Sequence, residues 1–183
     1  TSLAAYVLAD RGHLDFKAPV AEYWPEFAQK GKENILVSHI MSHSSGLAGW
    51  DAPVAGNDLY DPDKVAALFE TQEPWWEPGT ALGYHAISVG NLMGEIIKRI
   101  SGKSVGNFFK DEIAKPLDID FHIGLEDKHH SRVAEIHQAV ESNPEDLFEL
   151  EEGSVMQKVM TNGIITAPAV SYTHLRAHET EEN

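Results

Sequence analysis

The stretch from Trp75 to His85, together with the helix predicted between it and Gly102, constrains this chain more than any other segment. It contains a Pro-Gly turn dipeptide, after which apolar residues recur with the 3.6-residue period of a helix. These residues are Val89, Leu92, Met93, Ile96 and Ile100. Glu95 and Arg99 form an i,i+4 pair on the opposite face. The pattern predicts an amphipathic helix that is buried on one face and ends at Gly102.

Two features of this segment go beyond its periodicity. Gly90 and Gly94 lie one turn apart and leave a smooth strip where another element can approach closely. Tyr84 stands just before the helix, whose N-terminus favours a phenolate and lowers the cost of losing the proton. A tyrosine at a helix start is more often a half-buried side chain whose hydroxyl is hydrogen-bonded, and spacing alone favours that interpretation. A phenolate at Tyr84 stays open as the alternative.

Length and composition exclude several classes of function. The 183 residues, 42% of them hydrophobic, are enough for one domain with a core, or for part of a larger domain. A net charge of −15 argues against binding to nucleic acid or to an anionic membrane surface. The chain has no cysteine, so it has neither a disulfide framework nor a thiol nucleophile. No apolar run approaches the roughly 20 residues of a membrane span. The compartment stays open, with the cytoplasm favoured.

Helices are also predicted outside the central segment. Residues 1–10 are apolar nearly all round, which predicts a helix buried on most sides and ended by Gly12. Ser38 is a candidate cap for a helical turn through Met41, before the chain turns at residues 42–46. Asp61 and Ser104 are candidate caps for two further helices. Core residues of those two helices are predicted to be Val65, Leu68, Phe69, Phe108, Phe109 and Ile113.

The C-terminal third gives weaker signals. Residues 121–125 alternate enough to predict a short strand. Residues 141–152 are acidic and predicted to be exposed, whereas the apolar residues that follow are predicted to pack at helical spacing. These apolar residues are Val155, Met156, Val159 and Met160. From about Ser171 the sequence resembles the read-through translation of a sequencing adapter. Residues 1–170 are therefore taken as the domain and residues 171–183 as a non-native tail.

Several stretches together resemble a known superfamily. They are Trp-Glu-Pro-Gly-Thr at 76–80, Tyr-His at 84–85, residues 90–104 and residues 8–27. These stretches are similar to the serine beta-lactamase and penicillin-binding-protein-like superfamily, and most similar to its family VIII carboxylesterases, which have a class C beta-lactamase fold. The resemblance implies an α+β domain. This chain would supply the mainly helical portion of that domain and little of its central antiparallel sheet.

The same resemblance implies a site and a chemistry. Tyr84 matches the tyrosine that works with a lysine as the base activating a nucleophilic serine, with no metal or organic cofactor. The Ser-x-x-Lys motif would precede Thr1, since no serine in this sequence has a lysine three residues on and no Gly-x-Ser-x-Gly elbow is present. The resemblance also implies that the family's third motif lies outside this sequence, beyond about Ser171. The resemblance therefore implies an internal fragment of a serine hydrolase, inactive as it stands.

Substrate preference depends on the residues around the tyrosine. The lactamase branch of the superfamily has Asn two positions after the tyrosine, where its side-chain amide can hydrogen-bond the side chain of a lactam. This chain has Ala86 there, which cannot make that hydrogen bond. An esterase is therefore favoured, with a small-molecule ester or amide as substrate and Trp76, His85 and Ala86 as candidate substrate-binding residues. His85 has no implied role beyond a surface or loop hydrogen bond. A beta-lactamase, a D-amino-acid peptidase and a non-catalytic penicillin-recognising module remain alternatives.

Two tryptophans and several histidines allow further interpretations. Trp75 and Trp76 are expected in the core, although the resemblance would place them near the active-site cleft. His39 and His43 have the i,i+4 spacing of zinc helices, but Ile40 stands where His-Glu-x-x-His requires Glu. No metal site is expected there, and no base is spaced to activate Ser44. The further histidines 129, 130 and 137 lie in a polar stretch and are expected on a solvated face.

Overall fold

The predicted central helix is present as α4, Ser88–Ser101. Its apolar face enters the core, where Leu92, Met93 and Ile96 are fully buried. The helix ends as predicted, because Gly102 adopts a left-handed φ of +70° and its N–H donates to the carbonyl of Lys98. Helix α4 begins at Ser88, later than the Pro78-Gly79 turn suggested, so a loop separates that turn from the helix.

The computed structural model describes residues 1–52, 54, 56–134 and 151–161. The other α-helices in these ranges are α1 Ser2–Asp10, α2 Val37–Met41, α3 Pro62–Thr71, α5 Val105–Phe109 and α7 Val155–Thr161. Short 3-10 turns are η1 Val20–Glu22, η2 Pro25–Phe27, η3 Gly56–Tyr60 and η5 Asp127–Arg132, and a π-helical turn, η4 Lys110–Ala114, continues α5. Extended pairing in the described ranges consists of an antiparallel bridge between Pro19 and Leu36.

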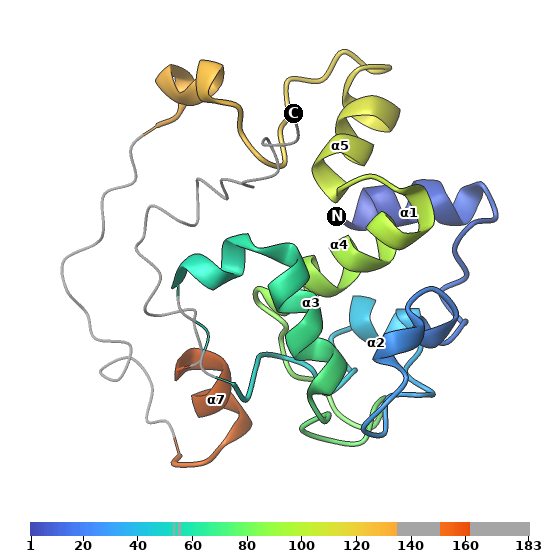
Figure 1. Cartoon of the computed structure of the whole chain (residues 1–183), viewed down its shortest axis with the longest axis vertical. Coiled ribbons are helices and arrows are strands. Elements are labelled where there is room, and N and C mark those ends of the chain that lie inside the picture. The colour runs from blue at the N-terminus through green and yellow to red at the C-terminus, as the bar shows by residue number, and fades with distance from the viewer. Residues whose placement is uncertain (53, 55, 135–150, 162–183) are drawn as a thin grey trace.

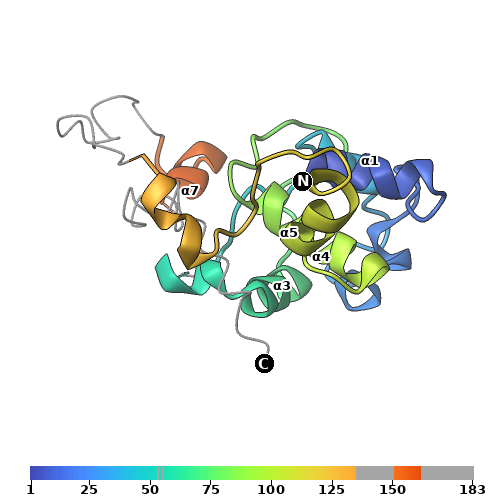
Figure 2. The same ribbon diagram turned by 90° about the horizontal axis from the view of Figure 1, so that it is seen from above.

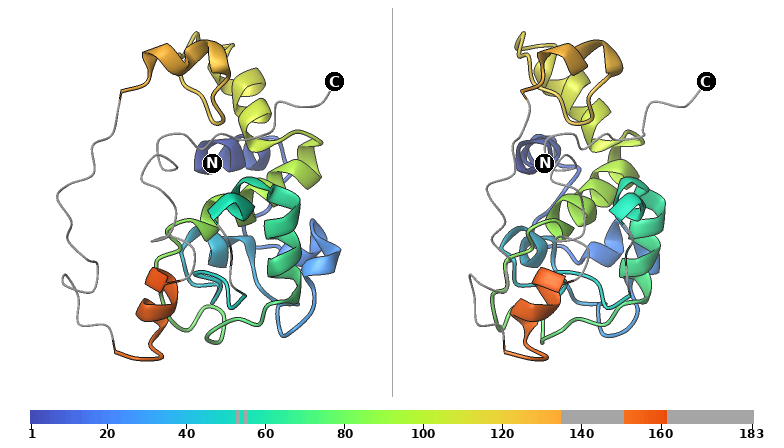
Figure 3. Two further views of the ribbon diagram at one scale, coloured as in Figure 1. Left: turned by 60° about the vertical axis from the view of Figure 1, so that its left-hand side comes forward. Right: turned by 90° about the vertical axis from the view of Figure 1, so that its left-hand side faces the viewer.

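Helix α4 occupies the middle of the helical arrangement. It packs against α1, α2, α3 and α5, and Figures 1 and 3 show it between α1 and α3. Helix α7 lies to one side of this group (Figure 2). The segment with the strongest helical period is therefore the one around which the others are arranged, as the sequence indicated. None of the helices in the described ranges is long and apolar enough to cross a bilayer.

Helix α1 is less buried than its composition predicted. Ala4, Ala5 and Leu8 face the core, whereas Leu3 is 53% exposed and Tyr6 is 57% exposed. The end of the helix is as expected, since Gly12 follows it with a φ of +73°. The prediction of a helix is confirmed. Burial on most sides is wrong, because the packed elements cover one face only.

The caps of α2 and α3 give one correction and one confirmation. Helix α2 begins after Leu36, whose backbone N–H donates to Nδ1 of His39 at 3.3 Å, so Ser38 lies inside the helix and does not cap it. Asp61 caps α3 as predicted, since its carboxylate accepts from the N–H of Lys64 at 3.0 Å. A carboxylate at a helix N-terminus also interacts favourably with the helix dipole.

The C-terminal elements depart further from prediction. Ser104 caps α5 by accepting from the N–H of Asn107 at 3.2 Å, and the predicted core residues Phe108, Phe109 and Ile113 are buried. Residues 121–125 form no strand, so that prediction is wrong. In α7, Val155 is 36% exposed and Met156 is 59% exposed, so the predicted packing fails for these two. Most of the acidic segment and the whole tail lie outside the described residues.

The polar face of α4 carries a partly buried charge cluster. Arg99 pairs with Glu95 at 2.6 Å, as the i,i+4 spacing predicted, and with Glu26 at 2.6 Å. Glu70 lies 3.7 Å from the same guanidinium and accepts from the indole N–H of Trp24 at 2.9 Å. The cluster thus links α4 to η2 and α3. Because Glu95 is only 9% exposed, its negative charge is compensated mainly by Arg99 and little by solvent.

The predicted close approach at the glycines of α4 is absent from the described residues. A Cβ added at Gly90 would meet nothing within 4 Å. One added at Gly94 would lie 3.9 Å from Val105, which is ordinary van der Waals contact. Space therefore does not require glycine at either position in the described part of the chain.

Candidate functional site

Tyr84 lies in the loop between α3 and α4, at the residues that precede α4. Its side chain is 71% exposed. Helix α4 has Ile87 as its N-cap, so Tyr84 stands before the helix N-terminus and not on its first turn. Its ring lies against the imidazole of His43, with ring centroids 4.9 Å apart and planes inclined at 52°. The phenol is therefore exposed to solvent, while its ring packs against His43, a residue about 40 positions earlier in the chain.

His43 belongs to the turn after α2. It has a left-handed φ of +61°, an uncommon conformation in which Asn, Asp and His are enriched among non-glycine residues. Its carbonyl accepts from the N–H of Gly83 at 3.0 Å, and its Nδ1 accepts from the N–H of His85 at 3.1 Å. The turn at 42–46 and the loop around Tyr84 are therefore joined by backbone and side-chain bonds.

His85 is buried, with 0% exposure. Its Nδ1 lies 2.5 Å from the carbonyl oxygen of Gly83, and its Nε2 lies 2.7 Å from Oγ of Ser45. A carbonyl can only accept, so Nδ1 carries the proton of the neutral ring and Nε2 accepts from the Ser45 hydroxyl. The Ser45 oxygen in turn accepts from the N–H of Leu47 at 3.3 Å. Of the two alternatives expected for His85, a surface or a loop hydrogen bond, the structure shows the loop hydrogen bond.

Burial also fixes the charge of this imidazole. It lowers the pKa of His85 from an ordinary value of 6.5 to about 4. The bond to the Gly83 carbonyl raises the pKa and the neighbouring His43 lowers it, both less than burial does. His85 is therefore neutral at pH 7, and in this arrangement it offers no exposed atom to a ligand.

The Ser45–His85 pair has the hydrogen bond of a nucleophile and its base, but both side chains are buried and inaccessible to a substrate. Ser45 has 0% exposure, like His85, so a carbonyl substrate has no approach to its Oγ. The neighbouring Ser44 Oγ lies 2.9 Å from Oγ of Ser42 and contacts no imidazole nitrogen. The pair therefore holds the loop in place, and neither serine has the geometry of a nucleophile here.

Trp76 closes the other side of the loop. It is half-buried and donates from Nε1 to the carbonyl of Ser44 at 3.3 Å. Its ring lies directly against Gly83, where an added Cβ would be 2.4 Å from Cη2. Trp75 is also half-buried and donates from Nε1 to Asp51 at 2.9 Å. Neither indole is fully in the core, which had been the expectation for both.

The structure brings together three of the four candidate site residues. Trp76, Tyr84 and His85 meet around the turn at 42–46, with the Trp76 and His85 rings 6.3 Å apart. Ala86 follows them and is exposed. The contribution of Ser45 and His43 was missed, since their partners lie about 40 residues away along the chain. The Tyr-His dipeptide and the Ser-His-Ser-Ser-Gly turn were both noted in the sequence, but nothing in it pairs them.

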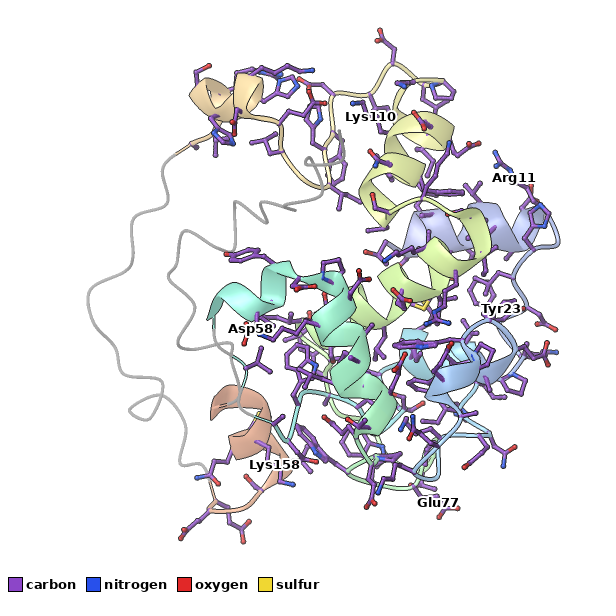
Figure 4. All side chains as sticks on the ribbon, in the orientation of Figure 1. Arg11, Tyr23, Asp58, Glu77, Lys110 and Lys158 are labelled. Atoms are coloured by element: carbon purple, nitrogen blue, oxygen red, sulfur yellow. The ribbon has the colours of Figure 1, made fainter. Side chains whose placement is uncertain are left out.

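A hollow of about 470 Å³ lies elsewhere in the described part of the chain. It is lined by residues of α5, by Lys110 of η4 and by residues 121–127. The side chains of Lys110 and Glu126 pair at 2.8 Å. Figure 4 shows Lys110 at the opposite end of the molecule from Glu77, which directly follows Trp76. The lining includes His122, which pairs with Asp120 at 3.1 Å, but it contains no serine, threonine or cysteine that this imidazole could activate. The Tyr84 loop is therefore the better candidate.

The two histidines of the zinc alternative are engaged with the backbone. His39 is in α2, but His43 lies beyond the end of that helix, so the pair does not share a helix face. Nδ1 of His39 accepts from Leu36 at 3.3 Å, and its ring lies beside Gly79. In the part of the chain that is described, no three His, Cys, Asp or Glu side chains gather as a metal site would require.

Comparison with known proteins identifies the family. The family profile described as "Beta-lactamase" matches residues 1–168. This chain belongs to the beta-lactamase family. The resemblance found in the sequence is thereby confirmed, and so is the expectation of a mostly helical part of a beta-lactamase fold.

Individual beta-lactamase-family proteins share much of this chain. It is 38% identical over 132 residues to "Esterase/beta-lactamase LipL" of Mycobacterium tuberculosis, a match that covers 68% of this chain and 29% of LipL. A solved family VIII carboxylesterase has 43% identity and a TM-score of 0.72, covering 74% of this chain and 38% of its own. EstA from Arthrobacter nitroguajacolicus Rue61a has 29% identity and a TM-score of 0.77, covering 91% and 43%. The chain thus spans less than half the length of these relatives.

Proposed function

We propose that this chain is the tyrosine-bearing part of a serine hydrolase that cleaves small esters through an acyl-enzyme. The observation that carries the proposal is the placement of Tyr84. Its phenol is exposed, while the backbone N–H groups of Gly83 and His85 on either side of it donate to His43, and the His85 ring is held by a buried hydrogen bond to Ser45. A base must reach its reacting partner and still keep a fixed position, and this arrangement supplies both conditions.

In the proposed reaction Tyr84 accepts and then returns a proton in each of two steps, acylation and deacylation. Its phenolate takes the proton from a serine hydroxyl as the serine Oγ bonds to the ester carbonyl carbon. Collapse of the tetrahedral intermediate expels the alcohol oxygen, which takes that proton from Tyr84 and leaves the acyl group on the serine. Water then gives a proton to Tyr84 as it attacks the acyl carbon, and the serine oxygen regains the proton when the acid leaves.

The serine and its lysine are proposed to lie outside this sequence, in a Ser-x-x-Lys motif, because no serine here has a lysine three residues on. An ammonium beside the phenol would lower its pKa from the ordinary value of about 10 towards neutrality. The 183-residue chain by itself is therefore expected to hydrolyse neither p-nitrophenyl esters nor nitrocefin.

Ester rather than lactam cleavage is supported by the residues on the exposed side of the loop. Ala86 is exposed and has no amide to bond a lactam side chain, whereas the half-buried indole of Trp76 offers an apolar surface. We therefore assign Trp76 and Ala86 to the substrate side. The buried ring of His85 supports the loop from behind.

The test uses the longer coding sequence recovered from the source DNA. The expressed protein should hydrolyse p-nitrophenyl butyrate faster than nitrocefin, and Tyr84→Phe should lower kcat by about 100-fold or more at an unchanged fold. Circular dichroism and thermal unfolding check the fold of the variant. An absent Ser-x-x-Lys motif would favour a non-catalytic binding module. Full activity of Tyr84→Phe would remove Tyr84 as the base.

A further inference from the structure

One residue contacts three consecutive residues of the Tyr84 loop. The carbonyl of His43 accepts from Gly83, its ring lies against the ring of Tyr84, and its Nδ1 accepts from the N–H of His85. The backbone N–H groups of the two residues that flank Tyr84, Gly83 and His85, therefore both donate to His43. The phenol itself is 71% exposed, and the ring contact with His43 orients it.

We propose that His43 is the positioning residue for Tyr84, and that it acts through its neutral Nδ1 and its ring face. This inference rests on the proposed role of Tyr84 as base and adds a requirement to it. The base is aligned only while Nδ1 of His43 has a free lone pair for the N–H of His85.

The backbone of His43 supports a dedicated role. A φ of +61° places the residue in the left-handed region, which non-glycine residues adopt at a steric cost. In that conformation both the carbonyl and the side chain of His43 meet the 83–85 loop. The neighbouring Ser45 also contacts this loop, through its hydrogen bond to the His85 ring. The turn at 42–46 therefore binds the loop through both His43 and Ser45.

Protonation of His43 would remove its acceptor. A protonated imidazole donates from both nitrogens, so Nδ1 could no longer accept from His85 and the alignment of Tyr84 would be lost. The titratable side chains that face His43 in the described residues are Tyr84 and His85. His85 is buried and neutral at pH 7, so it brings no charge to His43 there. The contact thus requires an unprotonated Nδ1 on His43.

Two variants separate the acceptor from the ring. His43→Asn keeps a side-chain acceptor near the place of Nδ1 and tolerates the left-handed backbone, whereas His43→Phe keeps an aromatic ring against Tyr84 and loses the acceptor. Both keep the bond from Gly83 to the backbone carbonyl. His13→Asn, at an exposed histidine outside the site, serves as the matched control.

The first measurement uses NMR on the 183-residue chain and needs no catalysis. In the wild type the His85 amide and the Tyr84 ring signals should shift at the pH at which the His43 ring signals titrate. In His43→Asn that pH dependence should disappear while the His85 amide stays protected from exchange. In His43→Phe the amide should exchange about tenfold faster or more, because its acceptor is gone. Signals of Tyr84 and His85 that ignore the titration of His43, or equal exchange in both variants, would overturn the proposal.

The second measurement uses the longer, active protein. His43→Phe should lower kcat about tenfold with little change in KM, and His43→Asn should restore kcat to within about threefold of wild type. His13→Asn should keep the kcat of the wild type. Equal losses in His43→Asn and His43→Phe would show a merely structural role. If Tyr84→Phe retains full activity while the NMR coupling is present, the proposed function fails and the contact stands.

Discussion

Acidification should destabilise this protein through one buried imidazole, that of His85. Burial lowers the pKa of its folded state to about 4, against an ordinary value of 6.5. A base whose folded pKa is lowered binds its proton first in the unfolded chain as the pH falls. The unfolded state therefore gains stability relative to the folded state between pH 6.5 and pH 4, and the loss is complete below that window.

The magnitude follows from the width of the window. Each pKa unit corresponds to about 1.4 kcal/mol, so the shift of His85 from 6.5 to about 4 is worth at most about 3.5 kcal/mol, of which about 2 kcal/mol is lost by pH 5. The folded ring has 0% exposure, and Nδ1 and Nε2 both have hydrogen-bond partners, so little solvent is present to stabilise the cation. The carboxylates of Asp111, Asp120 and Glu126, whose pKa the fold lowers to about 2, contribute little to this difference, because their loss begins near their ordinary values of 3.8 to 4.5 and so falls mostly below pH 5.

The assay is urea unfolding followed by tryptophan fluorescence at pH 7.5, 6.0 and 5.0. His85→Gln removes the titrating group, and its amide can still pair with Ser45 and with the Gly83 carbonyl. The wild type should lose about 2 kcal/mol more than His85→Gln between pH 7.5 and pH 5. His13→Gln, a histidine replaced at an exposed position, should keep the pH dependence of the wild type.

Parallel curves would refute this reasoning. If wild type and His85→Gln lose the same free energy of unfolding between pH 7.5 and pH 5, then His85 is not held neutral by burial. An NMR titration of the His85 ring gives the same answer directly, since its signals should show no midpoint between pH 5 and 7.5.

Three further substitutions test the packing around the site and the central helix by urea unfolding. Gly83→Ala should cost about 1–3 kcal/mol, because the new Cβ would lie 2.4 Å from a ring atom of Trp76; unchanged stability would mean that the loop yields easily. Gly90→Ala should stabilise α4 by about 0.5–1 kcal/mol, since nothing lies within 4 Å of its Cβ position, and a loss would point to an unseen close neighbour. Arg99→Leu should cost up to about 3 kcal/mol by leaving Glu95 buried without its cation, and a cost below about 1 kcal/mol would contradict that.

The helical elements were largely predictable because their signals are local. The 3.6-residue period of α4, the Asp61 and Ser104 caps and the left-handed Gly102 each depend on residues within a few positions along the chain. Such signals fix where a helix begins, ends and turns its apolar face. The family resemblance likewise rested on contiguous motifs, and it pointed to Tyr84 without describing its surroundings.

The surroundings of Tyr84 were decided by tertiary structure. His43 and Ser45 meet residue 85 from 42 and 40 positions away, and no local pattern encodes which distant backbone N–H or imidazole will face them. The same limit explains the wrong predictions. Alternation at 121–125 is insufficient for a strand without a partner to pair with, and the spacing of Val155 and Met156 does not supply a surface to cover them. Periodicity is a property of neighbours in sequence, whereas burial, and with it the charge of His85, is set by whatever the fold brings alongside.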